Sequence, residues 1–241
     1  MAYFTVKRVS ELARGHVLAP ERYDPRRGSL LLADGDLLSV ALSRVAESAR
    51  MIVGPGTDAI TQAIILDTSD AREGLVISAK TPVDRNQIGS AKKCVRVGDV
   101  IISRLRPYLR QVAFVDARIP NWRSDVALVC STEFFVLRSI DERPISFLVP
   151  FLLSAQVQAI LAAAQEGGHH PRFNEATLFG LPVPKAVLEK REDLSAEVEL
   201  ATALYRDSET KLWSLVLGAE AAIAGLRSVE AKVAKAASHH S

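Results

Sequence analysis

The sequence predicts an α+β protein, in which a globular domain with a curved, mostly antiparallel sheet is followed by one long C-terminal helix. Two observations predict this class. The strand-like runs do not alternate regularly with helical segments, which argues against a doubly wound parallel sheet. After the two prolines of 180–187, the chain continues to its end without another proline, as a long helix requires. We therefore expect a globular domain at 1–187 and a helix at 188–238.

Six runs rich in β-branched and aromatic residues predict the strands, at 4–9, 61–67, 73–79, 99–103, 111–116 and 131–138. Helical spacing predicts two shorter helices, at 36–50 and 145–167. The second should begin after Pro144, bend near Pro150 and end at Gly167 and Gly168.

Composition limits the class of protein. No run approaches the ~20 apolar residues of a membrane span, and the first residues lack the apolar run of a signal peptide. We expect a cytoplasmic protein that makes no membrane contact. Cys94 and Cys130 lie in apolar surroundings without a Cys-x-x-Cys spacing, so we expect reduced core residues.

Motifs of catalysis are missing from the sequence. We find no phosphate-binding loop, no GxGxxG after a strand, no HExxH, no GxSxG, no acidic cluster suited to Mg²⁺ and no Asn-Pro-Pro-aromatic run. We predict a chain that is not an enzyme and has no catalytic residue, cofactor or metal site. A hydrolase that uses His169 or His170 stays an open alternative.

Positive charge gathers in the middle of the chain, where residues 81–188 hold 13 Lys and Arg against 9 Asp and Glu. Within it, the predicted hairpin at 98–116 carries Arg104, Arg106, Tyr108 and Arg110, which strict strand alternation would place on one face. Guanidinium groups match phosphate oxygens and the guanine edge. The alternative is a charged solvent face that protects an edge hairpin from aggregation.

Two neighbouring stretches add further donors. Residues 166–174 offer His170, Arg172 and Asn174 after a helix, although a plain helix-capping loop is the alternative. Residues 89–99 offer Lys92 and Lys93, which we expect on phosphates unless they serve only solubility. The predicted DNA-facing residues are Lys92, Lys93, Arg104, Arg106, Tyr108, Arg110, His170, Arg172 and Asn174.

Apolar residues recur in steps of four and three along the predicted C-terminal helix, the heptad pattern of a coiled coil. The seam consists of Leu194, Val198, Ala201, Tyr205, Leu212, Leu215, Ala219, Ala222, Leu226, Val229 and Val233, with polar Ser208 as the one interruption. A helix of about forty residues is roughly 60 Å long, so it needs a partner helix. The alternative is an amphipathic helix that packs on its own domain.

The order of motifs resembles a target recognition domain of type I restriction-modification specificity subunits. The matching features are Gly-Asp before an apolar strand, the Arg-Pro turn, the Ser-x-Glu-Phe strand, and a loop that ends in Pro-x-Pro before the long helix. The match covers roughly 90–235, and 1–60 fit only loosely.

The resemblance implies a protein that reads one half of a split site on double-stranded DNA. Its helix would act as a spacer and dock an adenine methyltransferase subunit, and a restriction subunit could join the same complex. Specificity subunits commonly hold two recognition domains and two spacer helices, whereas this chain has one set, so we expect a homodimer joined through antiparallel helices. Two other functions stay open: a coiled-coil scaffold without DNA binding, and a detached recognition domain of a fused type II restriction-methylation enzyme.

Overall fold

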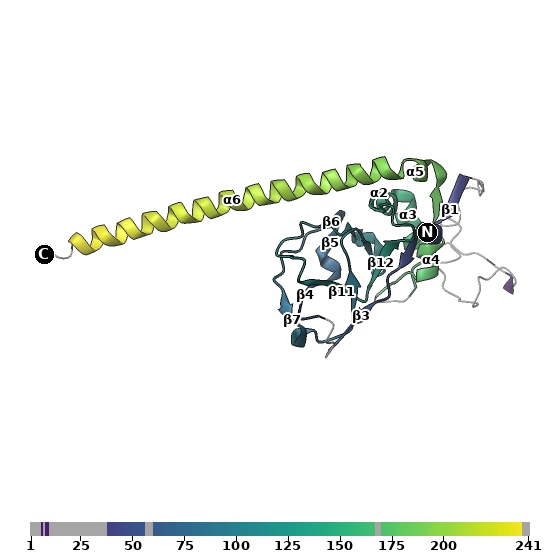
Figure 1. The fold of residues 1–241 in the computed structure, drawn as a ribbon, viewed down its shortest axis with the longest axis horizontal. Helices are drawn as coiled ribbons and strands as arrows, with labels where there is room; N and C mark the ends of the chain where they lie inside the picture. Colours follow the sequence, from purple (N-terminus) through teal and green to yellow (C-terminus); the bar gives the residue numbers. More distant parts are fainter. Residues whose placement is uncertain (1–5, 7, 10–37, 56–59, 167–169, 238–241) are drawn as a thin grey trace. The chain divides into compact units, whose positions relative to one another are not determined.

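The structure is a computed structural model that describes residues 6, 8–9, 38–55, 60–166 and 170–237, with side chains described as far as 224 (Figure 1). The predicted strand at 4–9 lies largely outside the described residues, as do Gly167, Gly168 and His169. The chain divides into two compact units, Met1–Glu199 and Leu200–Ser241. The first unit thus extends past the predicted boundary at 187 and includes the beginning of the long helix.

The strands of the first unit form three sheets within the described residues. The largest has the order β2 (Ala46–Ser48), β12 (Phe134–Ser139), β9 (Val100–Ser103), β10 (Val112–Phe114), β6 (Gly74–Val76) and β5 (Ala71–Arg72). The second has the order β3 (Ile52–Val53), β8 (Lys92–Val95), β11 (Ala127–Ser131), β4 (Gln62–Leu66) and β7 (Val83–Asp84). The third pairs β1 (Ser39–Ala41) with β13 (Pro182–Pro184). Only β10–β6 and β11–β4 are parallel among these pairs, which confirms the mostly antiparallel α+β class.

The six-stranded sheet is buried on both faces, because successive side chains of a strand point to opposite sides. On one face, Val100 and Ile102 pack in a core with helices α2 (Leu148–Leu153) and α3 (Ala155–Ala163). On the other face, Ile101 packs in a second core with residues of the five-stranded sheet, such as Ile64 and Leu128. The order of layers is therefore helices, large sheet and smaller sheet.

The two shorter helices differ from their predictions. The described part of 36–50 is not α-helical but forms β1, the short 3-10 helix η4 (Leu42–Arg44) and β2. Pairing of β1 with β13 and of β2 with β12 satisfies these backbone groups and overrides the local helical spacing. In 145–167, the chain bends at Ser154, whose Oγ caps α3 by accepting from the backbone N–H of Val157 at 3.4 Å. Pro150 causes no bend because it lies in the first turn of α2, where its missing N–H is not needed.

The described part of the first unit also contains short elements. They are the 3-10 turns η5 (Thr68–Asp70), η6 (Arg85–Gln87) and η7 (Pro107–Leu109), and the helices α4 (Glu175–Phe179) and α5 (Lys185–Glu189).

Helix α6 (Arg191–Ala237) confirms the predicted long helix, drawn from green to yellow in Figure 1. Its first turns belong to the first unit, where Leu194 and Val198 pack against the core. The first two residues of the predicted seam therefore make contacts within the same chain. In the second unit, Leu212 and Leu215 are exposed, at 62% and 60%. The side chains of the last three predicted seam residues, at 226, 229 and 233, lie outside the described part.

Within the described residues, no helix combines the length and the apolar character needed to cross a bilayer.

Candidate nucleic-acid interface

The arginine-rich segment forms a tight turn between two buried strands. Strand β9 ends at Ser103, and the antiparallel strand β10 begins at Val112, which confirms the predicted hairpin. Arg106 and Arg110 have left-handed φ values of 49° and 52° and flank the 3-10 turn η7. A side chain costs about 1 kcal/mol or more in this conformation. The predicted strict alternation of 104–110 is therefore wrong, because extended backbone stops where the strained turn begins.

Tyr108 lies at the tip of this turn and is 63% exposed, whereas Pro107 is buried beneath it. The side chain of Arg110 is 45% exposed, and its Nε lies 3.9 Å from an Oε1 of Glu73. The Arg106 side chain is half-buried. The turn thus presents a phenol and arginine side chains at the surface, although not in one row.

The turn and the predicted 166–174 stretch lie side by side. The Arg106 backbone N–H donates to the Pro171 carbonyl at 3.1 Å, and the Phe173 N–H donates to the Arg104 carbonyl at 3.2 Å. Phe173 is 1% exposed and packs against Phe135, with ring centroids 5.7 Å apart. A buried aromatic side chain and two backbone hydrogen bonds therefore hold two segments together that are far apart in the sequence.

Glu133 joins these two segments from a third. It lies in the turn between β11 and β12, where its backbone carbonyl accepts from the Arg104 N–H at 2.9 Å. Its Oε1 accepts from Arg172 Nη2 at 2.8 Å, while its Oε2 accepts from Arg172 Nε at 2.9 Å and from Arg104 Nε at 3.0 Å. We call Arg104, Glu133 and Arg172 the arginine clamp.

The clamp keeps its carboxylate ionised. The hydrogen bonds from Arg172, followed by the bond from Arg104, lower the pKa of Glu133 to about 2 although its partial burial opposes this. The same bonds raise the pKa of Arg172. Sequence reasoning passed over Glu133, which was visible only as the acid of the Ser-x-Glu-Phe motif.

The remaining predicted residues of 166–174 have different surroundings. His170 is exposed, and its backbone carbonyl accepts from Arg172 Nη1 at 3.0 Å. Asn174 is exposed but caps helix α4, where its Oδ1 accepts from the backbone N–H of Thr177 at 2.8 Å. The helix-capping alternative is therefore correct for Asn174, whose side-chain oxygen has a local partner.

The lysine pair is divided between two environments. Lys93 is half-buried: its Nζ donates to the Phe134 carbonyl at 2.6 Å and lies 5.3 Å from the centroid of the Phe135 ring. Burial lowers the pKa of Lys93. Its ammonium group therefore points to the protein interior. Lys92 Nζ donates to the hydroxyl of Ser90 at 2.6 Å, in an exposed position.

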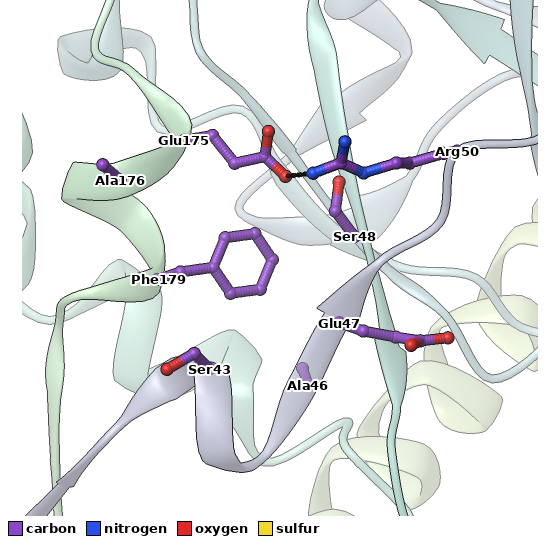
Figure 2. A pocket seen from close by; sticks show the side chains of 8 residues that line it. All are labelled: Ser43, Ala46, Glu47, Ser48, Arg50, Glu175, Ala176 and Phe179. Carbon is purple, nitrogen blue, oxygen red and sulfur yellow. Dashed lines mark hydrogen bonds and ion pairs between the residues drawn. The ribbon is translucent and has the colours of Figure 1, made fainter.

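An open groove of about 780 Å³ lies between β2 and α4, the helix that Asn174 caps. Figure 2 shows the Phe179 ring extending from α4 towards β2. An ion pair joins the same two parts of the chain, with Arg50 Nη2 3.1 Å from Glu175 Oε1. The groove is lined by Ser43, Ala46, Glu47, Ser48, Arg50, Glu175, Ala176 and Phe179.

Cys94 and Cys130 are free thiols, as predicted. Cys130 is buried in the core between the two large sheets, while Cys94 is only partly buried. Among the described residues, no group of three or more His, Cys, Asp or Glu side chains is placed to hold a metal ion.

Comparison with known proteins identifies the fold. No protein-family model matches the sequence, and no curated protein matches it. One similar solved chain comes from a structure described as the structural basis underlying complex assembly and conformational transition of the type I R-M system. It shares 25% sequence identity at a TM-score of 0.54, over 71% of this chain and 43% of that chain.

A second similar structure is the HsdS subunit from Thermoanaerobacter tengcongensis, with 22% identity and a TM-score of 0.47 over 73% of this chain and 46% of that one. The chain thus spans less than half the length of either structure. The likeness to the type I R-M system agrees with the order of motifs in the sequence. We conclude that the chain contains a domain similar in fold to a chain of a type I R-M system, in agreement with the resemblance predicted from the order of motifs.

Proposed function

We propose that this chain is the DNA-binding specificity subunit of a restriction-modification complex and carries no catalytic residue of its own. It would read one half of a bipartite duplex site and dock an adenine methyltransferase subunit through α6. The observation that carries the proposal is the arginine clamp. It unites two stretches that the sequence predicts to face DNA, in a domain similar to a chain of a type I R-M system.

The charge around the clamp suits a polyanion. Arg104 and Arg172 share one carboxylate, so the clamp keeps a net positive charge, and Arg106 follows directly. The side chains of Arg104 and Arg172 are 38% and 40% exposed, which leaves part of each side chain at the surface. Phosphate contacts of such groups fix the register of a protein on DNA, and contacts to base edges select the sequence.

Binding to DNA is tested on duplexes with a randomised centre. The wild-type chain should enrich a defined sequence, and its affinity should fall as salt rises because bound arginines release counterions. Arg104→Ala combined with Arg106→Ala should abolish the enrichment. Arg123→Ala is the control, since Arg123 is exposed and paired with Asp125 at 3.2 Å in another loop. Equal enrichment by the double variant would remove both arginines from the interface.

Dimer formation would follow from the apolar residues of the second unit. Leu212 and Leu215 lie on the predicted seam and are exposed in the single chain. Burying a leucine side chain stabilises by about 1.5–3 kcal/mol, so a second helix has several contacts to gain. A two-fold axis would pair the helices antiparallel and set the distance between two half-sites by the helix length.

Sedimentation at micromolar concentration tests the dimer. Leu212→Asp together with Leu215→Asp should give a monomer. Leu217→Asp is the matched control, because Leu217 is 60% exposed but lies off the seam. A wild-type monomer in the absence of a partner subunit would contradict the homodimer.

Docking of a catalytic partner needs a separate experiment. Co-expression with the methyltransferase encoded by a neighbouring gene should give a complex that survives purification, and the same experiment with a restriction subunit tests whether that subunit joins it. Mapping of the modified adenines should then return a site with two symmetric halves. A complex that modifies DNA without this chain would exclude the proposed role.

A coiled-coil scaffold without DNA binding is the second candidate. One observation favours it: Lys93, Arg104 and Arg172 all donate to groups within the protein. Such a scaffold would form the dimer but enrich no duplex and show no mobility shift. A detached domain of a fused type II enzyme would bind DNA and requires a methyltransferase gene nearby.

A further inference from the structure

We infer that Glu133 is a positioning residue for DNA recognition, which fixes Arg172 as a support and directs Arg104 towards the bases or phosphates of the target. The inference rests on the proposed function and assigns different roles to two arginines that the sequence places in one class.

The hydrogen bonds of the clamp separate these roles. Arg172 gives its Nε and Nη2 to the two oxygens of Glu133 and its Nη1 to the His170 carbonyl, so all three of its nitrogens bond within the protein. The Arg104 side chain donates to Glu133 through its Nε alone. Its terminal nitrogens form the fork that recognises a phosphate or the guanine edge. Arg104 is therefore the guanidinium whose recognition edge is left for a ligand.

Two hydrogen bonds also hold the backbone of Arg104 in place. Its N–H donates to the carbonyl of Glu133 at 2.9 Å, and its own carbonyl accepts from Phe173 at 3.2 Å. With both the backbone and Nε held, the side chain loses less freedom on binding than a free surface arginine. Such preorganisation improves selectivity because a displaced base edge no longer meets the fork.

The negative charge of Glu133 distinguishes a positioning role from simple attraction of DNA, because the two roles predict opposite effects when the charge is removed. A surface built only to attract DNA would gain affinity by losing this carboxylate, since removal of Glu133 adds one positive charge to the clamp. A positioning role predicts the opposite for the correct sequence. Glu133→Gln should bind unrelated duplexes as well as or better than the wild type, while its preference for the target falls.

Glu175 provides a matched control for charge. It lies in the first turn of α4 and makes one exposed ion pair with Arg50, whose side chain is 79% exposed (Figure 2). Glu175 lies near the clamp electrostatically, because Glu175 and Arg104 are both among the charges that shift the pKa of half-buried Lys93. Glu175→Gln thus removes the same charge nearby without opening the clamp.

The experiment uses the full chain and fluorescence anisotropy. Two duplexes serve as probes: the sequence that the wild type enriches most from the randomised pool, and a scrambled sequence of equal composition. Glu133→Gln should lower the ratio of the two affinities about tenfold, the range of one good base contact. Glu175→Gln should keep the ratio within twofold of the wild type.

A double-mutant cycle with Arg104→Ala distinguishes positioning of Arg104 by Glu133 from general support of the fold. In that background, Glu133→Gln should change the ratio no further, because the positioned group is already gone. An additional loss would show that Glu133 acts on the whole surface and would overturn the inference. Equal losses in Glu133→Gln and Glu175→Gln would also overturn it, since charge alone would then explain both.

Arg172→Lys gives an independent measurement if Glu133→Gln does not fold. It keeps the charge but cannot make the two parallel bonds of a guanidinium. It should lower the ratio in the same way, and an unchanged ratio in this variant would overturn the inference. A wild-type chain that enriches no sequence would refute the proposed function itself, and the inference with it. If the wild type binds its target but Glu133→Gln or Arg172→Lys leaves the ratio of affinities unchanged, the positioning role alone is refuted.

Discussion

Arg191 should be among the most important single side chains for the stability of the first unit. It begins α6, yet its side chain is 4% exposed. Its Nη1 and Nη2 donate to the two carboxylate oxygens of Asp141 at 2.8 and 2.9 Å, and its Nε donates to the Pro144 carbonyl at 2.7 Å. The Arg143 carbonyl accepts from Nη2 at 2.8 Å. The guanidinium of Arg191 therefore satisfies hydrogen-bond acceptors of residues 141–144, in the loop that leads into α2.

Replacing Arg191 by alanine leaves these acceptors without their donor. Removal of one partner from a buried ion pair costs about 3–5 kcal/mol. The Asp141 side chain is 40% exposed and regains water, so we take the lower end, about 3 kcal/mol. For a unit of this size, the midpoint of thermal unfolding should then fall by roughly 6–12 °C.

Unfolding by urea, followed through tryptophan fluorescence, measures this loss. Trp122 reports on the first unit, because it packs against the core, and Trp213→Phe removes the exposed second tryptophan. Arg143→Ala is the control, since its ion pair with Glu192 is 53% and 57% exposed and should contribute less than about 1 kcal/mol. A loss below about 1 kcal/mol for Arg191→Ala would mean that these buried hydrogen bonds contribute no more than a surface ion pair.

Three further predictions concern the first unit. The pKa values of Glu133 and Asp141 are lowered to about 2, by hydrogen bonds from Arg172 and from Arg191 respectively, so the folded chain binds fewer protons than the unfolded chain near pH 4. The stability that they contribute is complete above about pH 5 and is lost as pH falls towards 2; urea midpoints that stay constant over this range would contradict it. Burial raises the pKa of Cys130 to about 12, so this thiol should react with an aromatic disulfide at pH 8 only as fast as the chain unfolds, as absorbance would show. Gly98 has a φ of +94° and open space around its Cα, so Gly98→Ala should cost about 1–2 kcal/mol in urea unfolding, whereas Gly89→Ala should cost much less.

Runs of β-branched and apolar residues predicted more of this fold than helical periodicity did. The strands at 61–67, 73–79, 99–103 and 111–116 each contain an observed strand, because fully buried strands are marked by continuous β-branched and apolar residues. The helix predicted at 36–50 is wrong, because the apolar spacing of this segment suits a helix while its backbone pairs with β12 and β13. Long-range pairing of this kind leaves no mark in a local window.

The candidate site divides in the same way. Its arginines were visible in the sequence, since charge next to buried strands is unusual. Their geometry was not visible, because Arg106 and Arg110 adopt left-handed conformations that no side-chain pattern announces. The internal use of Lys93 and Asn174 also depends on neighbours that the fold supplies.

The α+β class, the long proline-free helix and the positive charge of the middle segment can be read from the amino-acid order alone. These follow from composition and from short-range spacing, which act within one segment of the chain. The folded domain was needed to show that Glu133 bonds to both Arg104 and Arg172, and that Leu194 and Val198 pack against the core. Contacts between residues far apart in the chain are fixed by packing and strand pairing, and these exist only once the whole domain has folded.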